Sequence, residues 1–205
     1  MSQTIATDLE VGMTLTCRRA RHTRFTFWHY IAEFWDLGHT LFRTTPETYP
    51  VKFLAGDVFD DAHLLPTTSR PFGPPLPVGS VDSLTELQGC VSVIYASSFF
   101  HLFSEEKQFE ACKRLAALLD PRPGSIIFGS HGATPVKGQR PEVFTKTFCH
   151  SPESWTQMWE EQIFEKGQVK VSTAFKELET SVEGKAVLIG GGTNFYWLSW
   201  SVERL

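Results

Sequence analysis

Short apolar runs recur along the chain and predict the strands of a sheet. Residues 90–96 (CVSVIYA) and 125–128 (SIIF) are nearly continuous in apolar side chains, which is typical of strands covered on both faces of a parallel sheet. Residues 51–55 (VKFLA) and 195–202 (FYWLSWSV) predict two further strands. Residues 169–175 mostly alternate between apolar and polar side chains, as expected of a strand with one exposed face.

Helix signals separate these runs. A first short helix is predicted by apolar residues that share one face, namely Phe34, Leu37, Leu41 and Phe42. Ser104 is a suitable N-cap for the clearest helix, because glutamates follow in the first turn, where the helix dipole favours acids. Pro121 marks the end of that helix. Ser151, followed by Pro152 at the first helical position, predicts the start of another.

The alternation of strands and helices predicts an α/β protein with a mainly parallel sheet and an antiparallel strand near the C-terminus. Residues 1–30 show neither a strand nor a helix period, so we treat them as an atypical N-terminal segment and residues 31–205 as the α/β domain. Ligands of such sheets bind beyond the carboxyl ends of the strands. The strand ends visible in the sequence are residues 56–59, 97–101 and 129–131.

Composition narrows the function classes. The chain has 205 residues, is 41% hydrophobic and has a formal charge of −4, so it can bury a core and has no basic excess for binding nucleic acid. The aromatic share of 13% favours a packed interior or an apolar ligand site. The cysteines, Cys17, Cys90, Cys112 and Cys149, lack the spacing of a metal site, and we expect none. No apolar run is long enough to span a membrane, and we expect a cytoplasmic protein.

Polar residues at the strand ends are candidates for chemistry. Asp57 either closes a turn or accepts hydrogen bonds from a ligand. Ser97 and His101 follow the central strand; His101 could face a substrate as a general base, or simply pack beside its aromatic neighbours. His131 follows the next strand, where a solvated loop histidine is the simpler interpretation.

Three stretches together resemble one family. They are residues 53–60 (FLAGDVFD), 93–103 (VIYASSFFHLF) and 119–129 (LDPRPGSIIFG), and their order and spacing are similar to those of the S-adenosylmethionine (SAM) dependent methyltransferases of fungal meroterpenoid and other secondary-metabolite gene clusters. Residues 33–42 (EFWDLGHTLF) resemble a helix of the same family. The resemblance covers about residues 31–205.

The resemblance implies a Rossmann-like class I methyltransferase sandwich that binds SAM. The carboxylate of Asp57 would accept a hydrogen bond from the adenine amino group, and the backbone N–H of Val58 would donate one to a ring nitrogen. Ser97 would line the floor of the cofactor cleft. His101 would be the catalytic residue facing the substrate. The implied reaction is O-methylation of a carboxylate on an apolar natural-product intermediate, and a homodimer is a further expectation.

The N-terminal segment departs from the family, so the cofactor site is expected to be incomplete and the N-terminus atypical or truncated. The family has a glycine-rich loop after its first strand, but here Gly12 is followed by Met13 and residues 14–15 (TL). His29 or Tyr30 occupies the place of the acid that holds the SAM ribose. A degenerate, non-catalytic methyltransferase fold that serves as a partner or small-molecule binding module therefore stands as the alternative.

Overall fold

The computed structural model describes most of the chain, and the statements below refer to this part. The described residues are 12–17, 23–28, 32–49, 51–66, 81–140, 147–178 and 195–205. His29, Tyr30 and the glycines of residues 190–192 lie outside them. No helix in the described ranges combines the length and apolar character needed to cross a bilayer.

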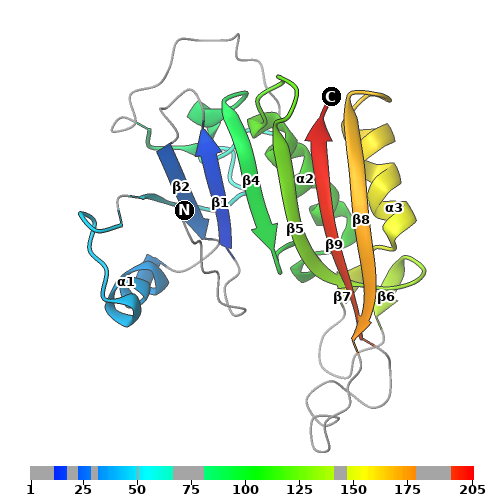
Figure 1. Ribbon diagram of the computed structural model, residues 1–205, viewed down its shortest axis with the longest axis horizontal. Coiled ribbons are helices and arrows are strands. Elements are labelled where there is room, and N and C mark those ends of the chain that lie inside the picture. Colours follow the sequence, from blue (N-terminus) through cyan, green and yellow to red (C-terminus); the bar gives the residue numbers. More distant parts are fainter. Residues whose placement is uncertain are drawn as a thin grey trace, which may run out of the picture.

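A seven-stranded sheet forms the centre of the molecule, in the order β3-β2-β1-β4-β5-β9-β8 (Figure 1). Its strands are β1 (Gly12–Cys17), β2 (Thr23–Trp28), β3 (Lys52–Ala55), β4 (Val91–Ser97), β5 (Ile126–Ala133), β8 (Val169–Leu178) and β9 (Phe195–Arg204). A separate two-stranded sheet pairs β6 (Gly138–Arg140) with β7 (Thr147–Cys149). The chain is therefore an α/β protein, and the strands predicted from the apolar runs are confirmed.

The expectation of a mainly parallel sheet is wrong, because the described sheet is mixed and its antiparallel pairings outnumber its parallel ones. Parallel pairing joins β2 to β3 and β4 to β5, whereas β1 is antiparallel to both β2 and β4. Only residues 18–22 connect β1 to β2, which is far too few for the crossover that a parallel pair requires. The predicted antiparallel C-terminal strand is confirmed, since β9 runs antiparallel to β5 and β8.

The N-terminal segment supplies two internal strands that the sequence did not predict. β1 and β2 lie between β3 and β4 in the sheet, so both strands contribute to its middle rather than to an appendage. Relative to each other, β2, β3, β4, β5 and β8 share one direction, and β1 and β9 are reversed. The boundary between residues 30 and 31 stays a prediction.

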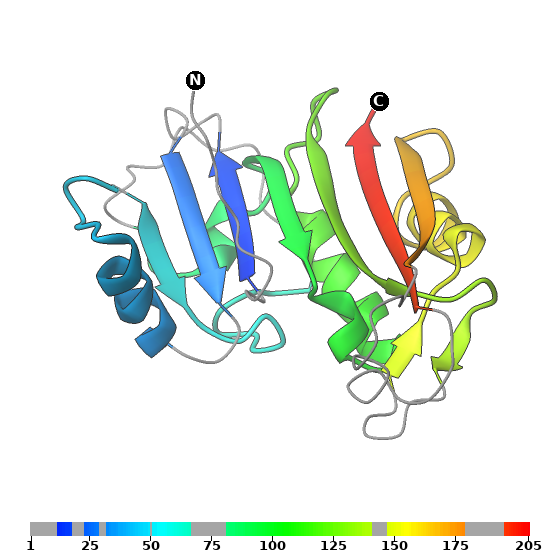
Figure 2. The same ribbon diagram turned by 60° about the horizontal axis from the view of Figure 1, so that its bottom comes forward.

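The predicted helices are present as α1 (Ala32–Phe42), α2 (Glu105–Leu118) and α3 (Pro152–Gln157), the last continued by a π-helix, η5 (Met158–Ile163). Their caps are those expected: Ser104 accepts from the Lys107 N–H, and Ser151 accepts from the Ser154 N–H. Both views place α2 and α3 on the same face of the sheet, while α1 lies beside the β3 edge (Figures 1 and 2).

The core lies between the sheet and the helices α2 and α3. It is built from alternate residues of the central strands and from the apolar stripes of the helices, including Ile94, Ile127, Leu198, Val202, Leu115 and Trp159, all fully buried. The apolar residues of α1 behave differently: Leu37 and Leu41 are 58% and 75% exposed. Helix α1 is held instead by Trp35, whose ring stacks on Phe53 of β3 with centroids 5.0 Å apart.

Candidate functional site

The carboxyl ends of β2, β3, β4 and β5 meet at one edge of the sheet. Trp28 pairs with Ala55, and the backbone N–H of Ser98 donates to the carbonyl of Ser130 at 2.7 Å. Because β1 is reversed, its first residue, Gly12, lies opposite both Trp28 and Ser97 at this edge. The chain after Gly12 therefore runs away from the edge where a cofactor loop would be wanted.

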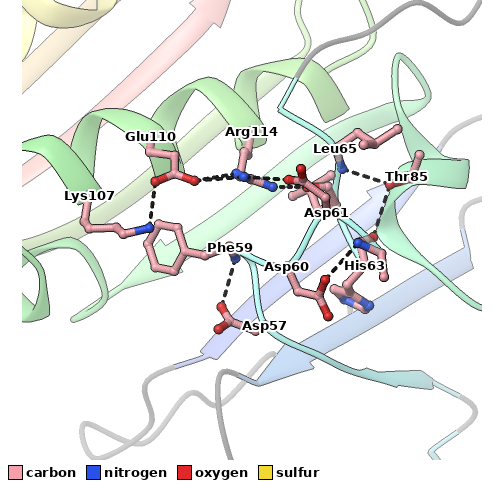
Figure 3. A network of polar contacts seen from close by, with 12 residues as sticks. Asp57, Phe59, Asp60, Asp61, His63, Leu65, Thr85, Lys107, Glu110 and Arg114 are labelled. Carbon is pink, nitrogen blue, oxygen red and sulfur yellow. Dashed lines mark hydrogen bonds and ion pairs between the residues drawn. The ribbon is translucent and has the colours of Figure 1, made fainter.

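Asp57 lies in the turn directly after β3, and its carboxylate shapes that turn. The Oδ1 atom accepts the backbone N–H of Phe59 at 2.8 Å, as in an Asx turn. Figure 3 shows the Asp57 side chain directed away from the ionic cluster on α2. A carboxylate has several acceptor positions, so the bond to Phe59 is compatible with further hydrogen bonds.

Val58 is fully buried, and its backbone N–H has no hydrogen-bond partner among the described residues. Buried backbone N–H groups are almost always paired in native proteins. An unpaired donor beside a carboxylate acceptor is the combination that an adenine ring edge can satisfy. The signal is invisible in the sequence, because it depends on the turn geometry.

His63 covers the glycine that precedes Asp57. A Cβ atom placed on Gly56 would lie 2.4 Å from the Nδ1 atom of His63, so only glycine fits beneath the ring. Burial lowers the pKa of His63, although Asp60 and Asp57 act in the opposite direction. The His63 ring is therefore neutral near pH 7, and it packs on Gly56 at the start of the turn.

A buried arginine clamps the same turn to helix α2 (Figure 3). Arg114 contacts Glu110 and Asp61, each at 2.8 Å, and donates to the carbonyl of Leu64. Lys107 bonds Glu110 at 2.8 Å and lies over the Phe59 ring. Burial alone would raise the pKa of Glu110, but hydrogen bonds from Lys107 and Arg114 outweigh it and leave that pKa lowered.

Replacing Arg114 by methionine is expected to destabilise the protein by about 2 kcal/mol, because the carbonyl of Leu64 and the carboxylates of Glu110 and Asp61 lose a charged donor. Lys113→Met is the matched control, since Lys113 is the next residue on α2 and is exposed. Urea unfolding of both variants measures the difference. Equal stability of the two variants would show that the clamp contributes nothing.

The second strand-end segment follows β4. The Ser97 hydroxyl lies 2.9 Å from the Ser130 hydroxyl on β5, so its side chain is turned toward the neighbouring strand. Ser98 has a φ of 53°, a left-handed conformation that is rare for a residue with a side chain. It turns the chain into the 3-10 helix η4 (Phe100–Leu102), which carries His101 half-buried beside Trp197.

Aromatic contacts bring the two strand-end segments together. Phe103 lies edge-to-face with Phe59 and with Phe99, and both pairs have centroids 5.1 Å apart. The turn of Asp57 and Val58 is thereby packed against the segment that carries Ser97 and His101. The structure thus gathers the residues that the sequence singled out, while their roles toward a ligand stay predictions.

The interpretation of His131 as a solvated loop histidine is wrong. The residue is part of β5, only 1% exposed, within an aromatic cluster on the helix-covered face. Burial lowers its pKa well below the usual value, and the nearby His101 and His150 act in the same direction. Sequence reasoning ended β5 at Phe128, because the polar and small residues after it hide the continuation.

His150 precedes α3, and its Nδ1 atom lies 2.9 Å from the Ser154 hydroxyl at the start of that helix. Burial lowers the pKa of His150 to about 4, with opposing smaller effects of Glu105 and Lys137. Within the described ranges, no group of histidine, cysteine or acidic side chains has the arrangement of a metal site.

No protein-family model matches the chain, but similar proteins exist among fungal enzymes. The O-methyltransferase phiE of a fungal species is 36% identical over 149 residues, which are 71% of this chain and 43% of that protein. The asnovolin E/chermesin D methyltransferase nvfJ of Aspergillus novofumigatus is 30% identical over 82% of this chain and 52% of its own length. The methyltransferase adrK of Penicillium rubens is 28% identical over 84% of this chain and 54% of its own length.

The chain spans about half the length of these relatives, whose shares range from 43% to 54%. These matches agree with the resemblance to fungal methyltransferases that the sequence shows. The chain is homologous to part of these fungal methyltransferases.

Proposed function

We propose that the chain is a SAM-dependent methyltransferase of secondary-metabolite biosynthesis that methylates a carboxylate oxygen of an apolar natural-product acid. Asp57, Val58 and Ser97 would bind the cofactor, and His101 would face the substrate. The observation that carries the proposal is the turn after β3, in a segment that resembles the family. It presents a carboxylate acceptor next to a buried, unpaired backbone N–H.

The described residues fit the adenosine end of SAM better than its methionine end. At the adenosine end, Asp57 and Val58 offer an acceptor and a donor side by side. At the methionine end, β1 points away from the edge, so the segment after Gly12 cannot supply backbone donors there. The two missing contacts are those of the glycine-rich loop and of the acid that holds the ribose, each worth about 1.5–3 kcal/mol. Without them a micromolar site becomes roughly millimolar, and we expect that affinity for SAM.

The chemistry at the acceptor is a simple displacement. SAM supplies the methyl group: a bond forms between a carboxylate oxygen and the methyl carbon, and the carbon–sulfur bond breaks with its electron pair moving to sulfur. The products are a neutral methyl ester and S-adenosylhomocysteine. No proton is transferred, so the proposed role of His101 is to face and orient the acid rather than to deprotonate it.

The reversed β1 favours one alternative. A degenerate member of the fold would keep the sheet and the clamp on Asp61 but bind no cofactor, and would act as a partner or small-molecule binding module. Calorimetry with S-adenosylhomocysteine separates the two. Binding at millimolar concentration supports the enzyme, and no heat at that concentration supports the degenerate protein.

Asp57→Ala and Asp57→Asn test the cofactor residue. Alanine removes the acceptor of the Phe59 N–H and also the proposed acceptor of the adenine amino group. Asparagine keeps an oxygen for Phe59 but turns an N–H₂ group toward the adenine amino group, which is also a donor. Both variants are expected to bind S-adenosylhomocysteine at least about tenfold more weakly, and only alanine is expected to lower the melting temperature.

Asparagine is the informative variant, because it separates the turn from the ligand. If Asp57→Asn binds S-adenosylhomocysteine as the parent chain does, Asp57 does not contact the cofactor and this part of the proposal is wrong.

A homodimer is also proposed, and the exposed apolar residues Leu37, Leu41 and Phe42 of α1 support it. Sedimentation equilibrium tests it, and a strict monomer at high micromolar concentration would contradict it.

A further inference from the structure

Two histidines and two tryptophans meet at the carboxyl end of β5. We call His131, His150, Trp155 and Trp200 the histidine–tryptophan cluster. The Trp155 ring lies 4.6 Å from His131, 5.4 Å from His150 and 5.0 Å from Trp200, centroid to centroid. All these side chains are buried, with exposures of 4% or less.

The hydrogen bond between Trp200 and His131 fixes the position of the His131 proton. The indole Nε1–H of Trp200 donates to Nδ1 of His131 at 3.0 Å, and an indole nitrogen can only donate. Burial lowers the pKa of His131, so the ring is neutral near pH 7. Its single proton must therefore be on Nε2, which makes that atom a hydrogen-bond donor.

This donor and its neighbours lack partners. The Nε2 atom of His131, the Nε1 atom of Trp155 and the Nε2 atom of His150 are buried without a hydrogen-bond partner among the described residues. At least two of them, on His131 and Trp155, are N–H donors. Buried polar atoms are rarely left unpaired in a native protein, so these donors are available to an acceptor such as a water oxygen or a ligand oxygen.

The cluster adjoins the edge of the proposed cofactor residues. His131 follows Ser130, whose hydroxyl is 2.9 Å from that of Ser97, and Phe100 from the segment after β4 has its ring centroid 6.0 Å from that of His131. The proposed substrate-facing residue, His101, is near enough to lower the pKa of His131. An acceptor held by the cluster would therefore lie beside the proposed site of methyl transfer.

We propose that the N–H groups of His131 and Trp155 bind a carboxylate oxygen of the acid that accepts the methyl group. This inference rests on the proposed function and adds the residues that recognise the acceptor. Neutral donors suit this task, because they orient a carboxylate without protonating it and so leave its oxygen nucleophilic.

Trp155→Phe tests the donor with little change in shape, because phenylalanine keeps an aromatic ring but has no N–H. Trp159→Phe is the matched control: Trp159 is also buried and has an unpaired Nε1, but its ring contacts are with Trp155, Phe164 and Trp200 rather than with a histidine. The probe is a farnesylated benzoic acid, titrated by calorimetry in the presence of S-adenosylhomocysteine. Its methyl ester serves as the uncharged comparison.

We expect Trp155→Phe to weaken binding of the acid about tenfold or more, with unchanged affinity for S-adenosylhomocysteine, and Trp159→Phe to change neither. His131→Gln, which keeps an N–H donor, is expected to retain part of the affinity that His131→Leu loses. Equal affinity of Trp155→Phe and Trp159→Phe for the acid would overturn the inference, and so would tight binding of the ester.

A second readout needs no cofactor and no activity. Nitrogen NMR of ¹⁵N-histidine-labelled protein is expected to show the Nε2–H tautomer of His131, and the acid is expected to shift that N–H signal while the ester does not. An Nδ1–H tautomer, or a signal indifferent to the acid, would contradict the inference. If the parent chain does not bind S-adenosylhomocysteine, the proposed function is wrong. The NMR titration tests the histidine–tryptophan cluster independently of that result.

Discussion

Replacing Gly129 by alanine is expected to cost the protein most of its stability. A Cβ atom on this residue of β5 would lie 1.7 Å from the carbonyl oxygen of Ala96 on β4 and 2.6 Å from the carbonyl carbon. Both are backbone atoms of the central parallel pair, so no side-chain rotation relieves the clash. We expect a loss of about 3 kcal/mol or more, at the upper end of overpacking effects.

Gly138→Ala is the control for this prediction, because a Cβ atom at Gly138 meets no heavy atom within 4 Å. Guanidinium unfolding followed by circular dichroism measures both variants, and Gly138→Ala is expected to unfold close to the parent chain. A Gly129→Ala protein within about 1 kcal/mol of the parent would mean that β4 and β5 do not pack as described.

Acid is expected to weaken the fold before any carboxylate is protonated. Burial lowers the pKa of His63, His131 and His150, and that of His150 falls from 6.5 to about 4. Above pH 6.5 the folded and unfolded chains are both neutral at these rings. Below it the unfolded chain binds protons that the folded chain refuses, so the free energy of unfolding falls as the pH falls.

For His150 alone the loss between pH 6.5 and about 4 is on the order of 3 kcal/mol. Urea unfolding at a series of pH values measures it. His150→Asn, which keeps a hydrogen-bonding atom near Ser154, is expected to flatten the slope between pH 6.5 and 4.5, and the slope left in that window should come from His63 and His131. A parent chain with constant stability over this window would contradict the assigned burial of these rings.

The sequence predicted the elements whose local signals agree with their place in the fold. The apolar runs of β4 and β9 and the N-cap of α2 are examples, because burial on both faces and a serine followed by acids leave clear marks. Asp57 was singled out for its place at a strand end, and the structure adds that its turn is clamped by Arg114 and covered by His63.

The rest depends on contacts between distant residues. Arg24 and the aromatic residues of β2 show no strand period, so the sequence could not predict that β1 and β2 form an internal hairpin. The cluster of His131 was missed for a related reason: a histidine is read as polar, and only the indole of Trp200, from the end of the chain, makes its place in the core favourable. Helix α1 shows the opposite case: its apolar stripe predicts a buried face, but the stripe is exposed, because the pattern alone does not determine what packs on it.

Single-turnover transfer of a labelled methyl group from SAM to a farnesylated benzoic acid tests the proposed function most directly. With millimolar SAM, the parent chain is expected to form labelled methyl ester slowly, because the methionine end of the cofactor is weakly held, and Asp57→Asn is expected to form far less. The absence of labelled ester from a chain that binds S-adenosylhomocysteine and unfolds cooperatively would contradict the proposal that this edge of the sheet methylates an acid.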